Sequence, residues 1–247
     1  MTSPTQIGAF FDLDGTLLPP PSLEWRFIGW LAAQGKIDGG HLAAWLGRFA
    51  REIWRDPYGA AFENKFYLRG VPESLADEWE LLLGAGSRCY FTAGVERVAR
   101  HQAQGHRVFL VTGTLGPLAR AAARCLPGTV EVRATELEAR EGRWTGRVAG
   151  EHLRGEAKAR AVRNVAALHG LDLAASYAYG NSLADLPMLE AVGHPVAVNP
   201  EVGLERVACS GLEAARPGAA ERAWRVCRWK PGARSRGRHF ISASEPR

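Results

Sequence analysis

The stretch that decides the fold is QIGAFFDLDGTLL, residues 6–18. Its largely apolar first half, residues 6–12, predicts a buried strand. The strand runs into Asp12-Leu13-Asp14-Gly15, and ligands of parallel sheets bind beyond the carboxyl ends of the strands. Beside a glycine that allows a sharp turn, two such carboxylates can point at one place. There Asp12 could act as a nucleophile and Asp14 could exchange a proton. Taken alone, the pattern fits an ordinary turn with solvated acids.

Downstream of Thr92 the chain alternates predicted helices and strands. This alternation is typical of an α/β fold, and we expect a Rossmann-like parallel sheet with helices on both faces. The predicted helices are 93–104, 115–125, 156–169 and 183–191, and the predicted strands are 106–111, 129–137, 143–148, 176–179 and 195–198.

A helical segment separates the first strand from this alternating region. Between Ser22 and Arg88, apolar residues recur at spacings of three and four, which predicts about four helices. Five of the eight tryptophans lie there and fit a small helical core better than a cofactor site. We therefore predict a core domain of residues 1–20 and 90–230, a helical domain of residues 21–89, and a basic, disordered tail of residues 231–247.

Two groups suited to an anion follow later in the chain. Thr112 and Gly113 end the apolar strand HRVFLV, and the hydroxyl could donate to a phosphate oxygen, although threonine is ordinary at strand ends. Lys158 lies in the first turn of a predicted helix, where its charge opposes the helix dipole. Since the chain has 27 arginines and only four lysines, this lysine indicates a specific task. It could neutralise a carboxylate and a phosphate together.

Oxygen ligands for a metal follow the strand SYAY. Mg²⁺ prefers octahedral oxygen ligands, usually one or two carboxylates with waters and a substrate phosphate. Asn181 and Asp185 are four residues apart, so they would share a face if the first turn is helical. The sequence therefore predicts a magnesium site at this end of the strand.

Together and in this order, these residues resemble the haloacid dehalogenase superfamily of hydrolases. Asp12–Leu17 matches its first motif, DxDGTL; Thr112 stands for the second, Lys158 for the third and residues 181–185 for the fourth. Across residues 6–200 the chain is most similar to the phosphoserine phosphatase-like branch, subfamily IB.

The resemblance implies a phosphatase in which Asp12 forms an aspartyl-phosphate and Asp14 serves as general acid and base. The phosphate-binding residues that it implies are Thr112, Gly113 and Lys158. It also implies Mg²⁺ as the cofactor, with Asp12, Asp14, Asn181 and Asp185 as its ligands.

The resemblance further implies that residues 21–89 form an α-helical cap of the C1 type. Glu24 lies near the start of this cap, where phosphoserine phosphatases have a glutamate that recognises the substrate amine. Two residues depart from the branch. Asn181 replaces the usual acidic metal ligand, and Ala184 stands where phosphoserine phosphatases usually have an asparagine.

Three functions fit these residues. The leading one is a Mg²⁺-dependent phosphomonoesterase for a small organic phosphate. The second is a phosphatase of a lipid or lipid-like phosphate, which the tryptophan-rich cap and basic tail favour. The third is a non-catalytic module that binds phosphorylated ligands. Its support is Asn181, which replaces the usual acidic metal ligand. A pure binder has no need of the Asp14 proton exchange, which argues against the third.

Composition and charge bear on the partners and the cellular location of the protein. The net charge of +5 arises after residue 227, because residues 228–247 hold six Arg or Lys and one Glu. Since residues 1–227 sum to zero, we expect no nucleic-acid partner, and at most weak contact of the tail with a membrane surface. The sequence has no run of 18 apolar residues and no signal-like segment at its start, so we expect a cytoplasmic protein. It does not indicate an oligomeric state.

Overall fold

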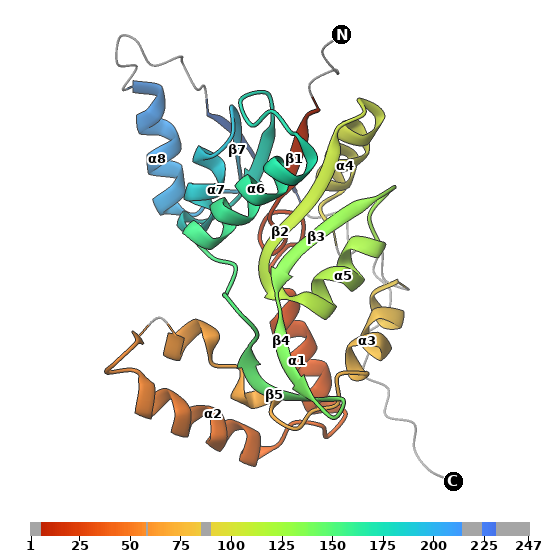
Figure 1. Ribbon diagram of the computed structural model, residues 1–247, viewed down its shortest axis with the longest axis vertical. Coiled ribbons are helices and arrows are strands. Elements are labelled where there is room, and N and C mark those ends of the chain that lie inside the picture. The colour runs from red at the N-terminus through yellow and green to blue at the C-terminus, as the bar shows by residue number, and fades with distance from the viewer. Residues whose placement is uncertain (1–5, 58, 85–89, 214–223, 231–247) are drawn as a thin grey trace.

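Parallel strands form the central sheet of the protein (Figure 1). The computed structural model describes residues 6–57, 59–84, 90–213 and 224–230, and in this part of the chain the sheet has six strands in the order β3-β2-β1-β6-β7-β8. The strands are β1 (Gly8–Phe11), β2 (Arg107–Leu115), β3 (Val130–Thr135), β6 (Tyr177–Gly180), β7 (His194–Val198) and β8 (Arg225–Cys227). Every residue of β1 is buried, which is why the strand is apolar without alternation.

Helices cover both faces of this sheet, so the predicted α/β fold is confirmed. On one face, Phe11 stacks on Tyr179 with ring centroids 4.3 Å apart, and α4 and α5 pack there. On the other face, Phe10 stacks on Phe109 at 5.1 Å, against α6, α7 and α8. The helices are α4 (Thr92–Ala103), α5 (Gly116–Arg124), α6 (Glu156–His169), α7 (Leu186–Glu190) and α8 (Val202–Glu213).

Two predicted elements are divided in the structure. The strand expected over 129–137 ends at Thr135, and β4 (Leu137–Arg140) pairs antiparallel with β5 (Arg143–Val148) as a separate two-stranded sheet. The helix expected over 183–191 is a 3₁₀ turn, Leu183–Asp185, followed by α7. Pro187 explains that break, because proline fits only the first turn of an α-helix.

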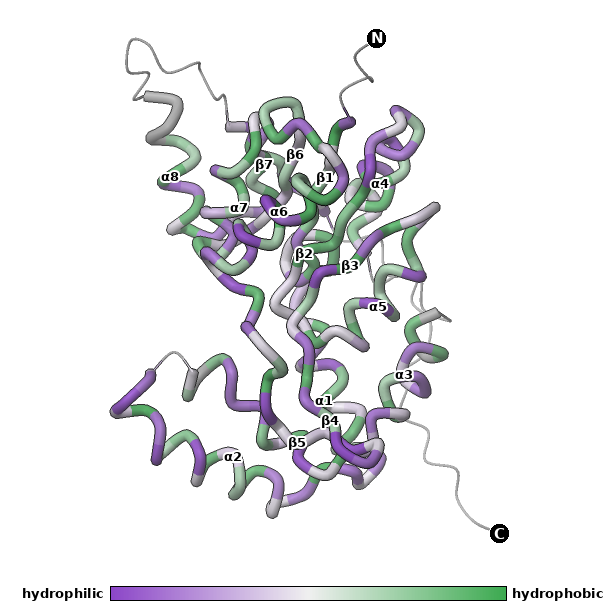
Figure 2. The backbone as a smooth tube through the Cα atoms, in the orientation of Figure 1, coloured by the Kyte–Doolittle hydropathy of each residue, from purple (hydrophilic) through white to green (hydrophobic). Residues whose placement is uncertain are grey.

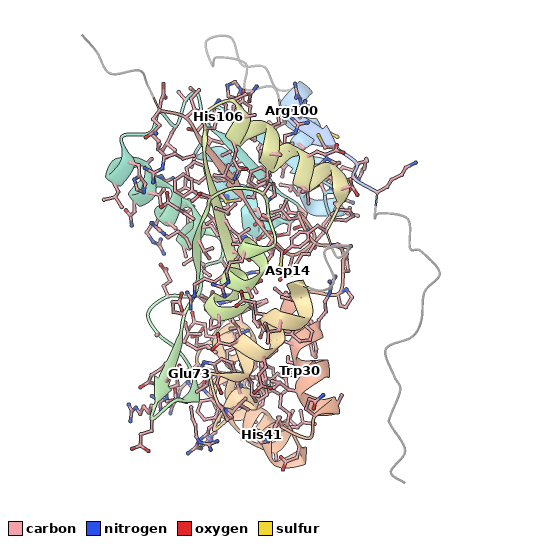
Figure 3. All side chains as sticks on the ribbon, turned by 90° about the vertical axis from the view of Figure 1, so that its right-hand side faces the viewer. Asp14, Trp30, His41, Glu73, Arg100 and His106 are labelled. Carbon is pink, nitrogen blue, oxygen red and sulfur yellow. The ribbon has the colours of Figure 1, made fainter. Side chains whose placement is uncertain are left out.

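The segment between β1 and α4 is helical, as predicted. It contains α1 (Leu23–Ala33), α2 (Gly39–Glu52), a π-helical turn (Gly59–Glu63), a 3₁₀ turn (Phe66–Leu68) and α3 (Leu75–Gly84). Figure 1 shows α1 and α2 beyond the carboxyl ends of the central strands, and Figure 3 shows Asp14 at the level where the two regions meet.

The β4–β5 hairpin lies with this helical segment, although it belongs to the range predicted as core. The amide of Lys65 donates to the carbonyl of Gly146 at 3.2 Å, and the amide of Gly70 donates to that of Trp144 at 2.8 Å. The Trp144 side chain is buried beside Phe27. The division into a core and a cap domain stays a prediction, and the predicted tail lies outside the described residues. Within the described ranges, no helix is long and apolar enough to cross a membrane.

Two neighbouring histidines, the buried His101 and the partly exposed His106, lie beside Tyr179 of β6. The hydroxyl of Tyr179 lies 2.7 Å from Nε2 of His101, whose Nδ1 lies 2.8 Å from Nδ1 of His106. Burial, together with the charge that His106 would carry if protonated, lowers the pKa of His101 to about 4. His101 is therefore neutral in the folded protein at neutral pH.

This histidine should make the fold acid-sensitive. Folding lowers the pKa of His101, so protonation of this residue favours the unfolded state. The free energy of unfolding is therefore undiminished by this group above pH 6.5 and falls as the pH drops towards 4. Between pH 7 and pH 5, denaturant titrations should show the unfolding free energy fall by about 2 kcal/mol more in wild type than in His101→Gln. His194→Gln, at an exposed position, is the control. Equal pH slopes in wild type and His101→Gln would contradict the assignment.

Candidate active site

Asp12 and Asp14 lie in the turn that follows β1. The amide of Asp12 donates to the Tyr179 carbonyl at 2.9 Å, so the end of β1 is fixed against β6. Gly15 has φ +82°, and a Cβ there would lie 2.2 Å from Nδ2 of Asn181. The turn therefore requires glycine, and it brings the first motif against the start of the fourth.

Lys158 lies between two carboxylates. Its Nζ is 2.5 Å from Oδ1 of Asp12 and 2.6 Å from Oδ1 of Asp185, and the residue is only 4% exposed. It comes from the first turn of α6, which begins after Gly155. The residue that composition singled out thus joins the first and fourth motifs.

Asn181 and Asp185 do not share a helical face, because Asn181 precedes the 3₁₀ turn. Instead Asp185 folds back, and its Oδ2 accepts hydrogen bonds from the amides of Asn181 (3.1 Å) and Ser182 (3.0 Å). Because these bonds cap the 3₁₀ turn at its start, Asn181 and Ser182 stay outside it and do not form the expected helical turn. Oδ1 of Asn181 still points towards the first motif, 3.4 Å from the hydroxyl of Thr16.

Thr112 and Gly113 line the same cavity as Asp12 and Asp14, and the hydroxyl of Thr114 lies beside them. Thr114 donates from Oγ1 to Oδ2 of Asp14 at 2.6 Å, and Oγ1 of Thr112 lies 3.2 Å from that hydroxyl. Oδ1 of Asp14 accepts from the amide of Leu23 at 2.7 Å. The sequence analysis missed Thr114. Residues two apart in an extended segment share a face, so Thr114 could have been predicted beside Thr112.

The site carries more negative than positive charge. Asp12, Asp14 and Asp185 converge around one ammonium, that of Lys158. Burial, together with the negative charges of Asp185 and Asp14, raises the pKa of Asp12 to about 7 against the attraction of Lys158. Burial also raises the pKa of Asp14, although Thr114 and Leu23 oppose it. For Asp185, burial is outweighed by Lys158, which lowers its pKa.

The donor set suits a hard cation. In the described part of the chain, no three acidic, histidine or cysteine side chains are grouped as a ready metal cluster. The carboxylates of Asp12 and Asp185 and the amide oxygen of Asn181 nevertheless lie around Lys158 and Thr16. Two carboxylates with neutral oxygens is the set that Mg²⁺ commonly uses, and the excess negative charge favours a cation.

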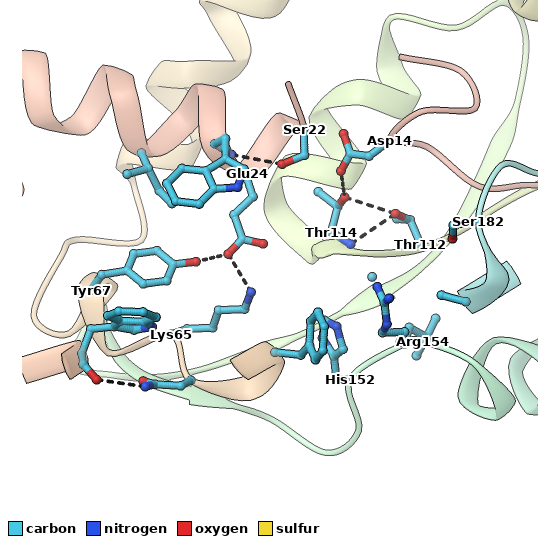
Figure 4. A pocket seen from close by; sticks show the side chains of 18 of the residues that line it. Asp14, Ser22, Glu24, Lys65, Tyr67, Thr112, Thr114, His152, Arg154 and Ser182 are labelled. Carbon is cyan, nitrogen blue, oxygen red and sulfur yellow. Dashed lines mark hydrogen bonds and ion pairs between the residues drawn. The ribbon is translucent and has the colours of Figure 1, made fainter. Parts of the chain in front are cut away.

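Beyond these residues a cavity of about 820 Å³ extends under α1 and α2. Glu24 lies in its wall, where its Oε1 accepts from Nζ of Lys65 at 2.6 Å and from the hydroxyl of Tyr67 (Figure 4). The sequence analysis missed both partners, because they are about forty residues from Glu24 and no local pattern links them. His152, Arg154 and Ser182 also line the cavity and were not predicted.

A family comparison agrees with this geometry. The model of the haloacid dehalogenase-like hydrolases matches residues 9–190, which include all four motifs. The chain belongs to this family. The expected resemblance and the expected hydrolase class are thereby confirmed.

Individual proteins are similar to this chain over most of its length. A probable phosphatase of Mycobacterium tuberculosis is 40% identical over 214 residues, covering 81% of this chain and 71% of the relative. A protein of unknown function from Bordetella pertussis Tohama I has a TM-score of 0.67 at 30% identity, covering 90% of this chain and 98% of that one. A probable phosphoserine phosphatase from Vibrio cholerae, 21% identical with a TM-score of 0.59 over 81% of this chain and 58% of its own, shares the fold.

The Lys158 ion pairs predict a large stability effect. Lys158→Met leaves Asp12 and Asp185 buried without their cation, so the unfolding free energy at pH 7.5 in metal-free buffer should fall by about 3 kcal/mol or more. Lys36→Met, at an exposed position, should change it by less than about 0.5 kcal/mol. Denaturant titration measures both, and equal values for the two variants would show that Lys158 does not neutralise these carboxylates.

Proposed function

We propose that this protein is a Mg²⁺-dependent phosphomonoesterase that acts through an aspartyl-phosphate on Asp12. The observation that carries the proposal is the convergence of Asp12, Asp14, Thr112 and Lys158 at one end of the sheet. Asp12 is held by a cation, Asp14 stands two residues away, and the hydroxyls of Thr112 and Thr114 adjoin Asp14. The phosphatase name of the 40% identical mycobacterial relative supports the same reaction class.

In this mechanism, an Asp12 carboxylate oxygen attacks phosphorus and the bond from phosphorus to the ester oxygen breaks. Asp14 gives its proton to that leaving oxygen. In the second half, Asp14 takes a proton from the water that attacks the aspartyl-phosphate, which releases phosphate and restores Asp12. The raised pKa of Asp14 suits this exchange, because burial favours the protonated form that gives its proton to the leaving oxygen.

Thr112, Gly113 and Lys158 are the proposed phosphate ligands. The hydroxyl of Thr112 and the amide of Gly113 supply neutral donors, and Lys158 supplies charge. A Cβ at Gly113 would lie 3.2 Å from the Leu153 carbonyl and 3.5 Å from His152, so a side chain there would crowd the cavity wall. A glycine keeps this wall open for an approaching phosphoryl group.

Mg²⁺ would be held by the carboxylates of Asp12 and Asp185, the amide oxygen of Asn181 and, by family resemblance, the main-chain carbonyl of Asp14. When bound, it would neutralise charge on the phosphoryl oxygens. Asn181 contributes no charge, so Coulombic attraction for the ion is weaker than with a third carboxylate.

Asp12→Asn should remove measurable phosphate release from para-nitrophenyl phosphate, a loss of about three powers of ten or more, because it deletes the nucleophile. The substitution is nearly isosteric, so far-ultraviolet circular dichroism should be unchanged. Asp77→Asn, at an exposed position on α3, is the matched control and should retain wild-type turnover. Turnover by Asp12→Asn within tenfold of wild type would refute the mechanism.

Asn181→Asp should lower the Mg²⁺ concentration needed for half-maximal activity, by roughly tenfold, since it adds a charge to the proposed metal shell. Asn181→Ala should raise it. Titrations of activity against Mg²⁺ at fixed ionic strength measure this concentration for wild type and both variants. If the half-maximal concentration is the same in all three proteins, Asn181 is outside the metal shell.

A further inference from the structure

Helix α1 is apolar on two faces. Leu23, Phe27 and Leu31 form the face that is buried in the core. Trp25, Ile28 and Ala32 form a second stripe, also at helical spacing, and all three line the cavity. A helix packed on one side normally carries polar residues on its other side. The second stripe lies outside the buried face of the helix, and Trp25 is 68% exposed.

Helix α2 turns more apolar side chains to the same cavity. Leu42 and Trp45 line it, and Trp45 stacks on Phe49 with centroids 5.5 Å apart. None of the residues of α2 is buried, and Leu42 remains 54% exposed. Figure 2 shows hydrophobic residues along α2 although it lies apart from the sheet. Contiguous exposed apolar surface of this kind marks a binding site.

Three polar side chains of this wall, those of Glu24, Lys65 and Asn64, already have partners within the protein. Glu24 is paired with Lys65, and both side chains are largely shielded from solvent. Asn64 donates to the Trp45 carbonyl at 3.1 Å and accepts from the Phe66 amide at 3.2 Å. A zwitterionic leaving group, such as that of an amino-acid phosphate, would have to compete with the Glu24–Lys65 pair. An apolar group would leave it intact.

The apolar wall and the proposed phosphate site belong to one cavity, lined at one end by Asp12, Thr112 and Lys158 and at the other by the two helices. Resting on the function proposed above, we propose that the substrate is a phosphomonoester whose alcohol carries an extended apolar chain or ring. The phosphate lies at Asp12 and the apolar part lies against Trp25, Leu42 and Trp45. A volume of about 820 Å³ suits a leaving group of this size, since pockets for drug-sized ligands span about 300–1,000 Å³.

Two substrate series test this inference on the 247-residue chain with Mg²⁺. The aliphatic series runs from methyl through butyl and hexyl to octyl phosphate, all below their micelle concentrations, and the aromatic series compares phenyl with naphthyl phosphate. Phosphoserine is the zwitterionic comparison. Each buried methylene should raise kcat/KM by up to about fourfold, so octyl phosphate should exceed butyl phosphate by on the order of a hundredfold. A rise along the aromatic series alone would identify a ring as the apolar group.

A matched pair of tryptophan variants locates the effect. Trp25→Ala should reduce the octyl-to-butyl ratio of kcat/KM about tenfold or more. Trp54→Ala removes the same side chain from a position that is 91% exposed and outside the cavity, and should leave the ratio unchanged. Calorimetric binding of butyl and octyl phosphate to Asp12→Asn gives the same comparison without turnover.

The outcomes separate this inference from the proposed function. Flat kcat/KM along both series, or phosphoserine as the best substrate, would overturn the apolar leaving group while the phosphatase activity stands. No turnover of any monoester, with octyl phosphate still bound more tightly than butyl phosphate, would refute the phosphatase and retain the ligand class. Equal loss of the ratio in the two tryptophan variants would contradict the assignment to α1.

Discussion

One buried ammonium organises the site. Nζ of Lys158 touches both Asp12 and Asp185, so it ties the end of β1, the start of α6 and the turn after β6 to one point. The strand order β2-β1-β6 makes this possible, because neighbouring parallel strands deliver their carboxyl ends to the same edge. Three carboxylates around one lysine leave an excess of negative charge. That excess favours a divalent cation, and the cation in turn favours a phosphate.

The sheet, the helical segment and the β4–β5 hairpin contribute different parts of the site around Lys158. In the proposed mechanism, the sheet supplies the groups that every phosphomonoester would meet, namely a nucleophile, a proton donor and phosphate ligands. The helical segment supplies the wall that a leaving group would meet. The β4–β5 hairpin links the two, because it leaves the sheet after β3 and packs its Trp144 against the helical segment before the chain returns to α6. Residues of the 90–230 range therefore support the wall as well as the centre.

Motifs whose residues lie at strand ends were predictable, since strand periodicity and the edge rule for parallel sheets both act locally. Asp12 and Thr112 were proposed in that way, whereas Lys158 was proposed because the chain has only four lysines and this one lies in the first turn of a helix. The Glu24–Lys65 pair was not, because about forty residues separate its partners and tertiary packing alone joins them. The break at Glu136 was also missed. The apolar alternation of Val130, Val132 and Ala134 stops at this residue, but the pattern does not show that the chain continues in a second sheet. Asp185 was expected on a helical face, but capping the turn satisfies its carboxylate better.

In the proposed mechanism, a phosphoryl group passes to Asp12. The most direct measurement is mass spectrometry of protein quenched in acid during turnover of para-nitrophenyl phosphate, followed by proteolysis at low pH. The account predicts a phosphorylated peptide whose modified residue is Asp12 and whose phosphate is removed by hydroxylamine, as an acyl phosphate requires. Phosphate on another residue, or turnover at full rate with no phosphorylated peptide, would contradict it.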